Sequence, residues 1–259
     1  MLRSRVIPCL LVQDGGLVKT VKFKDSKYVG DPINAVRIFN EKKADELIVL
    51  DIDVSVNSAE PDYKMIGNLA KECRMPLCYG GGIKTLAHAE KIVGLGVEKV
   101  ALSSVVFDRP NLIVEIANKI GRQSVVVVLD VKKKTLSSNY NVWTLNGRHN
   151  TKRNVVDVIQ QVQKLGVGEI ILNFIDFDGT EAGYPINVIR QLKSGVKVPL
   201  TIMGGAKSLE DMGSAVERCG LMGVSAGSLF VFKGKYRAFL INYPEQQQKE
   251  RFVYGKQYL

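Results

Sequence analysis

Short apolar runs rich in Val, Ile and Leu recur along the chain, and amphipathic stretches separate them. Such runs are typical of strands buried on both faces of a sheet, whereas the stretches between them have helical periodicity. We therefore predict strands near residues 5–12, 46–52, 76–79, 98–103, 124–130, 168–174, 198–203 and 222–226. Helices are predicted near residues 31–44, 61–73, 85–95, 110–119, 153–165, 185–194, 208–218 and 235–242.

The second half of this pattern repeats the first. The run Val6–Val12 corresponds to Val125–Val131, and the later strands and glycine-rich segments correspond in the same order. The period is too long for a solenoid and suits a duplicated half-barrel. We predict one α/β domain over residues 1–259, a single (β/α)8 TIM barrel with halves near 1–120 and 121–242. The tail, 243–259, shows little periodicity, which predicts partial disorder.

Composition and charge are those of an ordinary globular protein. Of the 259 residues, 46% are hydrophobic and 24% are charged, and the net charge is +10. The 36 Lys and Arg are spread along the chain, and the single triple, Lys132-Lys133-Lys134, is interpreted as a solvated loop rather than a nucleic-acid patch. A cationic barrel mouth would attract phosphorylated or nucleotide-linked substrates.

The cysteines and the N-terminus indicate a cytoplasmic protein. Cys9, Cys73, Cys78 and Cys219 have no zinc-ligand or disulfide spacing, which fits a reducing compartment. The apolar run that ends at Val12 is too short for a signal peptide, and no run is long enough to span a membrane.

Two connections are long for a barrel, residues 13–30 and 132–152. Loops of this length are usually lids or binding loops. Asn146-Gly147 lies between residues of strand character in the second connection, so a β-hairpin is an equally open interpretation there.

Three sequence patterns predict helix N-termini. Asp31-Pro32 and Asp108-Arg109-Pro110 each offer a capping aspartate at or before a proline. Ser208 with Asp211 resembles a weak capping box.

In such a barrel the reactive groups lie where the strands end. Glycine-rich loops follow the third and seventh predicted strands, and small hydroxyl-bearing loops follow the fourth and eighth. Unobstructed backbone N–H groups at a helix start bind phosphate, although each loop alone could be a tight turn. Because both halves carry the pair of loops, we predict two phosphate sites, formed by Gly82, Ser103, Ser104, Gly204, Gly205, Gly227 and Ser228.

Asp130 ends an apolar run, where burial would raise its pKa into the range useful for general acid or base catalysis. The alternative is an aspartate that anchors a loop. In the repeat, Leu11 occupies the position that corresponds to Asp130.

Several segments match one known family. They are Val6-Ile7-Pro8-Cys9-Leu10, Asp14-Gly15, Lys19, Gly30-Asp31-Pro32, Asp45-Glu46-Leu47, Leu50-Asp51-Ile52, Gly80-Gly81-Gly82-Ile83, Val125-Val126-Val127, Asp176-Phe177-Asp178-Gly179-Thr180-Glu181-Ala182-Gly183-Tyr184 and Gly204-Gly205-Ala206. To about residue 240, the chain resembles HisF, the cyclase subunit of imidazole glycerol phosphate synthase, more than the related isomerase HisA.

The resemblance implies a barrel that binds a bis-phosphorylated ribulosyl aminoimidazole carboxamide nucleotide and uses ammonia from a glutaminase subunit. It implies a heterodimer with a HisH-like glutaminase, no metal or organic cofactor, and no nucleic-acid or membrane partner. It adds Lys19, Asp176, Gly179 and Thr180 to the substrate-binding residues.

The family also has a charged gate through which ammonia enters the barrel, and its members match Arg5, Glu46, Lys99 and Glu169 in this sequence. These residues begin the first, second, fourth and sixth predicted strands. A ring of opposite charges there could close the bottom of an apolar tube, although ordinary strand-end salt bridges would look the same.

The chain departs from the family at Leu11. The family uses two aspartates as acid and base, and this sequence keeps only Asp130; Gln13 also stands where the family usually has Lys. This pattern resembles HisF-like paralogues of bacterial surface-polysaccharide loci, which supply ammonia for acetamidino sugars, and favours such a role in lipopolysaccharide biosynthesis. The alternatives are a genuine lyase of histidine biosynthesis and a non-catalytic conduit that activates the glutaminase.

Overall fold

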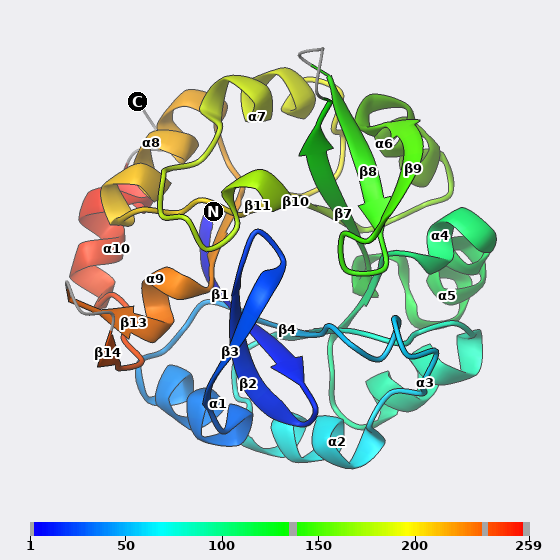
Figure 1. Ribbon diagram of the computed structural model, residues 1–259, viewed down its shortest axis with the longest axis horizontal. Helices are drawn as coiled ribbons and strands as arrows, with labels where there is room; N and C mark the ends of the chain where they lie inside the picture. Colours follow the sequence, from blue (N-terminus) through cyan, green and yellow to red (C-terminus); the bar gives the residue numbers. More distant parts are fainter. Residues whose placement is uncertain (1–2, 135–138, 235–237, 256–259) are drawn as a thin grey trace.

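Eight parallel strands close into a barrel within residues 3–134, 139–234 and 238–255, which the computed structural model describes (Figure 1). The barrel strands are β1 (Arg5–Gln13), β4 (Leu47–Asp51), β5 (Leu77–Gly80), β6 (Lys99–Leu102), β7 (Val125–Lys133), β10 (Glu169–Phe174), β11 (Leu200–Met203) and β12 (Gly223–Ala226). Adjacent strands pair in this order, and β12–β1 and β7–β10 pairing makes the ring continuous. The predicted (β/α)8 barrel is confirmed, and each predicted strand overlaps one barrel strand.

Helices surround the barrel in Figure 1. Those that overlap predicted ranges are α1 (Pro32–Glu41), α2 (Tyr63–Glu72), α3 (Leu86–Gly94), α5 (Leu112–Ile120), α6 (Val155–Lys164), α7 (Ile186–Lys193) and α8 (Leu209–Cys219). Short α4 (Val105–Asp108) and α9 (Ser228–Val231), and the 3₁₀ turns η1 (Arg122–Ser124) and η2 (Ile175–Phe177), complete the connections. None of the helices in the described part of the chain has the length and apolar character needed to cross a membrane.

The predicted eighth helix, residues 235–242, is wrong. Residues 235–237 lie outside the described part of the chain. Of the rest, β14 (Ala238–Phe239) pairs with β13 (Phe232–Lys233), and residues 240–242 belong to no helix or strand. The backbone N–H groups of Leu240 and Asn242 donate to the carbonyl oxygens of Val231 and Phe230, at 3.0 and 2.9 Å. These bonds satisfy donors that a helix would have paired internally.

The tail differs from the expectation of partial disorder across residues 243–255; residues 256–259 lie outside the described part. Helix α10 (Gln246–Phe252) begins with a capping box between Glu245 and Gln248. The buried Lys249 ammonium donates to the Asp45 carboxylate at 2.8 Å, and the Tyr254 hydroxyl donates to the same carboxylate. Long-range anchoring on Asp45 therefore orders a segment whose own sequence is polar.

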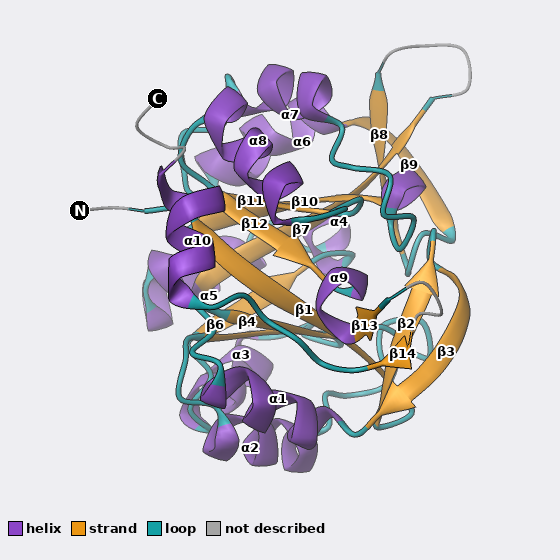
Figure 2. Cartoon of the chain, turned by 90° about the vertical axis from the view of Figure 1, so that its left-hand side faces the viewer, coloured by secondary structure: helices purple, strands orange, loops and turns teal. Residues whose placement is uncertain are grey.

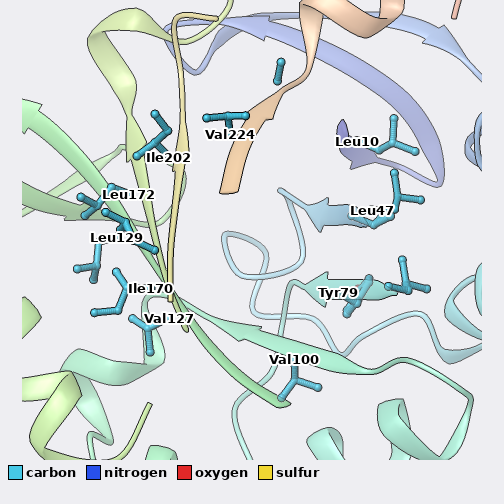
Figure 3. Packing of buried hydrophobic residues seen from close by; sticks show 14 of the residues in the cluster. Leu10, Leu47, Tyr79, Val100, Val127, Leu129, Ile170, Leu172, Ile202 and Val224 are labelled. Carbon is cyan, nitrogen blue, oxygen red and sulfur yellow. The ribbon is translucent and has the colours of Figure 1, made fainter. Parts of the chain in front are cut away.

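Alternation along the strands separates two apolar layers. Outward-facing side chains of the barrel strands, including those labelled in Figure 3, pack beneath the helices. Inward-facing side chains form a second cluster inside the barrel: Ile7, Cys9, Ile48, Cys78, Ala101, Val126, Val128, Ile171 and Met203. On β7, Val126 and Val128 face inward, so the period of two also turns Asp130 toward the barrel interior.

Two β-hairpins occupy the long connections, and Figure 2 shows them at the same end of the barrel. Strands β2 (Gly16–Val21) and β3 (Lys24–Gly30) form the first, and β8 (Tyr140–Thr144) and β9 (His149–Asn154) form the second. The second confirms the hairpin interpretation, with residues 135–138 outside the described part. Leu145, Asn146 and Gly147 all have positive φ in its turn, which Asn and Gly adopt at little cost.

The three predicted helix starts have different outcomes. The Asp31 carboxylate accepts from the Asn34 N–H and Pro32 begins α1, as predicted. Ser208 caps α8 through the Asp211 N–H, whereas the Asp211 carboxylate accepts from Lys207 and Tyr184 instead of closing the box. The Asp108 cap is wrong, because Asp108 ends α4 and Asn111 precedes α5 without a side-chain cap bond.

Two glycines test how tightly the barrel is packed. A Cβ at Gly168 would lie 1.9 Å from the Arg122 carbonyl oxygen, whereas one at Gly94 in α3 would meet nothing within 4 Å. Gly168→Ala is expected to lower the free energy of unfolding by at least about 2 kcal/mol, because backbone must move. Gly94→Ala is expected to raise it by about 0.5 kcal/mol. Urea unfolding checks both, and equal effects would contradict this packing.

Candidate functional site

A cavity of about 320 Å³ opens at the end of the barrel where the parallel strands finish. Parallel barrels place their reactive groups at this end. Eleven residues singled out from the sequence contribute to its wall: Leu11, Lys19, Gly82, Ser103, Ser104, Asp130, Gly179, Gly204, Gly205, Gly227 and Ser228. The strand-end rule therefore located the cavity, because parallel strands that share a register all end on one face.

Asp130 is buried in the cavity wall, near the C-terminal end of β7. The side-chain amide of Asn173 on β10 donates to its Oδ1 at 2.8 Å. Burial raises the pKa of Asp130 to about 7, although the bond from Asn173 opposes the shift; the charge of Asp178 adds to it. A carboxyl that titrates near neutral pH can both give and accept a proton, as general acid and base catalysis needs.

The equivalent position in the first half is apolar. Leu11 pairs with Leu50 across β1 and β4 in the same way that Asp130 pairs with Asn173 across β7 and β10. Both leucines line the cavity and pack on the inner apolar cluster. One half-barrel thus presents a hydrogen-bonded polar couple, and the other presents an apolar couple.

Lys19 reaches the cavity from the first hairpin. Its ammonium donates to the Cys9 carbonyl oxygen at 2.7 Å, and burial lowers its pKa. A Cβ at Gly227 would lie 2.5 Å from the Lys19 Nζ, so a larger residue there would push this cation away from the loop after β12. A cation, a glycine loop and Ser228 thereby meet in one corner of the cavity.

Two of the predicted substrate-binding residues do not line the cavity. The Asp176 carboxylate accepts from the Lys133 N–H at 3.0 Å, and the Thr180 hydroxyl donates to the Phe177 carbonyl oxygen at 2.8 Å. Both bonds hold the loop after β10, where η2 turns the chain. The role of these two residues in substrate binding therefore stays a prediction that the cavity lining does not include.

Asp178 takes the place in the cavity wall that was expected for Asp176. Its carboxylate accepts from the Thr20 hydroxyl at 2.8 Å and ties the first hairpin across the cavity. Burial raises the pKa of Asp178, against the bonds from Thr20 and Phe23. Asp178 lies in the same matched segment as Asp176, and sequence alone could not choose between two aspartates separated by one residue.

The glycine loops have the backbone that close approach requires. Gly81, Gly82, Gly204 and Gly205 all have positive φ, and added Cβ atoms would collide with the neighbouring chain. The Ser104 hydroxyl already accepts from the Leu145 N–H of the second hairpin at 3.0 Å. The Gly82 N–H donates to the Ser55 hydroxyl at 3.3 Å, so a phosphate at this loop would replace that bond.

The four predicted gate residues meet at the opposite end of the barrel. Arg5 binds Glu46 and Glu169, and Lys99 binds the same two carboxylates at 2.7 and 2.8 Å. The carboxylate side chains are about 5% exposed, whereas Arg5 and Lys99 are 25% and 18% exposed. Burial alone would raise the pKa of Glu169, but the charges of Arg5 and Lys99 lower it.

The inner apolar cluster lies between this ring and the cavity. Along β1, inward positions run from Arg5 through Ile7 and Cys9 to Leu11, so the strand passes from ring to cavity through apolar side chains. The interior between the ring and the cavity is therefore apolar, and an ion placed there would lose its hydration. Within the described residues, no group of three His, Cys, Asp or Glu side chains is placed to ligate a metal ion.

This chain is similar over most of its length to one family model and to several known proteins. The chain matches the family model described as "Histidine biosynthesis protein" over residues 5–237. It is 56% identical over 251 residues to the putative imidazole glycerol phosphate synthase subunit hisF3 of Vibrio vulnificus, covering 97% of this chain and 96% of the relative.

Two further relatives extend this range of similarity. The putative subunit hisF2 of Pseudomonas aeruginosa is 53% identical over 245 residues, 95% of this chain and 97% of that relative. The imidazole glycerol phosphate synthase subunit HisF of Lactococcus lactis subsp. cremoris strain SK11 is 37% identical over 218 residues, 84% of each chain.

The raised pKa of Asp130 predicts a pH dependence of stability. The unfolded carboxyl titrates near about 4, so between pH 4 and 7 the folded state binds more protons, and the free energy of unfolding falls as pH rises. Asp130→Asn is expected to remove this contribution, at most about 1.4 kcal/mol per pH unit. Urea unfolding at pH 5 and pH 8 checks it. The exposed control Glu41→Gln should keep the wild-type slope.

We expect that removing a cation from the ring lowers the free energy of unfolding more than removing one from an exposed ion pair. Lys99→Met leaves two buried carboxylates with Arg5 alone, and we expect a loss of about 2–3 kcal/mol in the free energy of unfolding. The loss should shrink at low pH, as acid protonates Glu169. Arg37→Met removes an exposed pair with Glu72 and should cost less than about 1 kcal/mol. Similar losses for the two variants would contradict a closed ring.

Proposed function

This chain belongs to the histidine biosynthesis protein family as a HisF-type enzyme subunit, and from that premise we propose that it adds ammonia to a phosphorylated acceptor. It works as the cyclase-type subunit of a glutamine amidotransferase complex. A HisH-like glutaminase releases ammonia from glutamine at the N-terminal end of the barrel. The acceptor binds in the cavity at the other end.

The charged ring and the apolar interior support the ammonia route. Ammonia is small and neutral, so it crosses the inner cluster around Ile7 and Cys78 at lower cost than ammonium. Arg5 and Lys99 are the more exposed members of the ring. A glutaminase docked on that face could displace one of them and open the entrance.

The glycine and serine loops support a phosphorylated acceptor. Gly82 and Ser104 form one phosphate site in this proposal, and Gly205 and Ser228 form the other. Backbone N–H groups free of side chains bind phosphate oxygens, and Lys19 adds a cation beside the second site. The net charge of +10 attracts such an anion to the cavity.

Asp130 is the acid and base of the reaction in this proposal. Its carboxyl lines the cavity, and burial raises its pKa to about 7, so it accepts the proton that the attacking nitrogen loses. Asn173 positions it by a bond to one oxygen, which leaves the other oxygen for the acceptor.

Leu11 is the observation that selects the acceptor. Ring closure of the histidine-pathway nucleotide uses a second carboxyl in the family, and the Leu11–Leu50 couple offers none at that position. We therefore assign ammonia transfer toward an acetamidino sugar of surface polysaccharide. The second candidate is the cyclase of histidine biosynthesis, which the intact Asp130 and ring would serve equally.

Turnover of the histidine-pathway nucleotide separates these candidates. With ammonium salt in place of glutamine, the unaltered protein is expected to convert the bis-phosphorylated ribulosyl nucleotide at least about a hundredfold more slowly than Leu11→Asp, because a proton-transfer group is restored. Leu11→Asn is the matched control, since it restores polarity but cannot accept a proton. Efficient cyclisation by the unaltered protein would place it in histidine biosynthesis.

A further inference from the structure

A buried carboxyl stands beside Leu11 on the neighbouring strand. Asp51 ends β4, and its Cα pairs with that of Val12 on β1. Its exposed fraction is 8%, and it lines the main cavity. The buried Oδ1 of Asp51 has no hydrogen-bond partner among the described residues. An unpaired buried oxygen is costly unless a proton or a ligand satisfies it.

Asp53 lies next to this carboxyl and faces a second cavity. The Asp53 carboxylate accepts from the Asp14 N–H at 3.1 Å, and it lies close enough to Asp51 for each carboxyl to shift the pKa of the other. The second cavity is about 120 Å³ and is lined by Asp53, Asp14 and Arg148. Ile52 and Asn146 line both cavities, whereas Asp51 lines only the first and Asp53 only the second.

The surroundings favour one proton on the pair. Burial first, and then the Asp53 carboxylate, raise the pKa of Asp51. Bonds from Asp51 and Asp14 lower the pKa of Asp53 although burial opposes them. Besides burial, Asp53 and the Val54 N–H shift the pKa of Asp51. The charge of Asp51 in turn raises the pKa of the buried Tyr79 hydroxyl on β5. Like charges in contact resist joint ionisation, so the pair keeps a proton where a lone aspartate would lose it.

We propose that Asp51 and Asp53 hold one proton between them and that Asp51 gives it to the acceptor in the first half-barrel, where Leu11 supplies no ionisable group. The inference rests on the proposed function. When Asp51 gives its proton to an atom of the acceptor, it becomes a carboxylate. A proton from water in the second cavity then returns through Asp53. Within this pair, Asp51 is a catalytic residue, alongside Asp130, and Asp53 is a positioning residue.

In the first half-barrel the carboxyl lies on β4 instead of at the Leu11 position on β1, and this shift fits an acceptor other than the histidine-pathway nucleotide. Asp130 pairs with Asn173 and lies on the inner face of the second half-barrel, whereas Asp51 pairs with Val12 rather than Leu11. The two proton-transfer groups are therefore not related by the repeat. In an acceptor that exchanges protons with both Asp130 and Asp51, the atom that takes the proton lies beside β4 rather than beside Leu11 on β1.

Titration tests the pair without any substrate. In the full-length protein labelled with ¹³C at aspartate carboxyls, and with Asp51→Asn for assignment, the Asp51 signal should titrate above the usual range of aspartate. Asp53→Asn should move this midpoint to lower pH, because a neighbouring charge is lost and an amide donor replaces it. Ionisation of both carboxyls below pH 5 in the unaltered protein would overturn the proposal.

Transfer of labelled nitrogen tests the use of the proton. With the chromosomal copy replaced by each variant and amide-¹⁵N glutamine supplied, Asp51→Asn should reduce ¹⁵N in the purified polysaccharide sugar at least about a hundredfold. Asp51→Glu should restore part of it. Glu60→Gln, which removes an exposed carboxyl before α2, is the matched control and should leave the label unchanged. Circular dichroism confirms that each variant folds.

The outcomes separate this inference from the proposed function. Unchanged label with Asp51→Asn would overturn the role of Asp51 and leave the function standing. Absence of label with the unaltered protein would count against the proposed function, and the titration would then decide whether the pair holds its proton.

Discussion

Pairing of β7 with β10 is the constraint on which the rest of the structure depends. This pairing closes the barrel, and its register runs from Val126 opposite Glu169 to Val131 opposite Phe174. The same register sets Asp130 opposite Asn173 at the cavity and Glu169 at the charged ring. Because inward side chains alternate along each strand, a shift by one residue would turn both functional ends out of the barrel. One set of backbone bonds therefore fixes the two ends together.

The barrel places its charges at its ends and keeps its middle apolar. Buried carboxylates are costly in isolation, and at the ring each of Glu46 and Glu169 contacts both Arg5 and Lys99. At the cavity, the cost of burying a carboxyl is offset in other ways. A neutral donor such as Asn173 bonds to the carboxyl, or the carboxyl keeps its proton. The ring cations thus lower the pKa of Glu169, whereas burial in the cavity raises the pKa of Asp130 to about 7.

The two half-barrels share a backbone but differ in chemistry. Equivalent strand positions carry Leu11 with Leu50 in one half and Asp130 with Asn173 in the other. Substitution at such a position changes the cavity wall without disturbing the fold, since leucine packs against the inner apolar cluster. The neighbouring Asp51 and Asp53 supply ionisable groups to the half that lacks them. The repeated backbone is thus symmetric, whereas the ionisable side chains placed on it are not.

The sequence by itself determined the barrel, its strand ranges and the end that carries the cavity, because apolar periodicity and the repeat are local signals that survive folding. It also named the four ring residues, although only through resemblance. The tertiary structure decided what depends on distant partners. It ordered the tail on Asp45, replaced the eighth predicted helix by backbone bonds to Val231, and chose Asp178 over Asp176 for the cavity. The contact of Asp51 with Asp53 also came only from the fold, because the direction of a side chain after a strand ends depends on the loop geometry rather than on the periodicity.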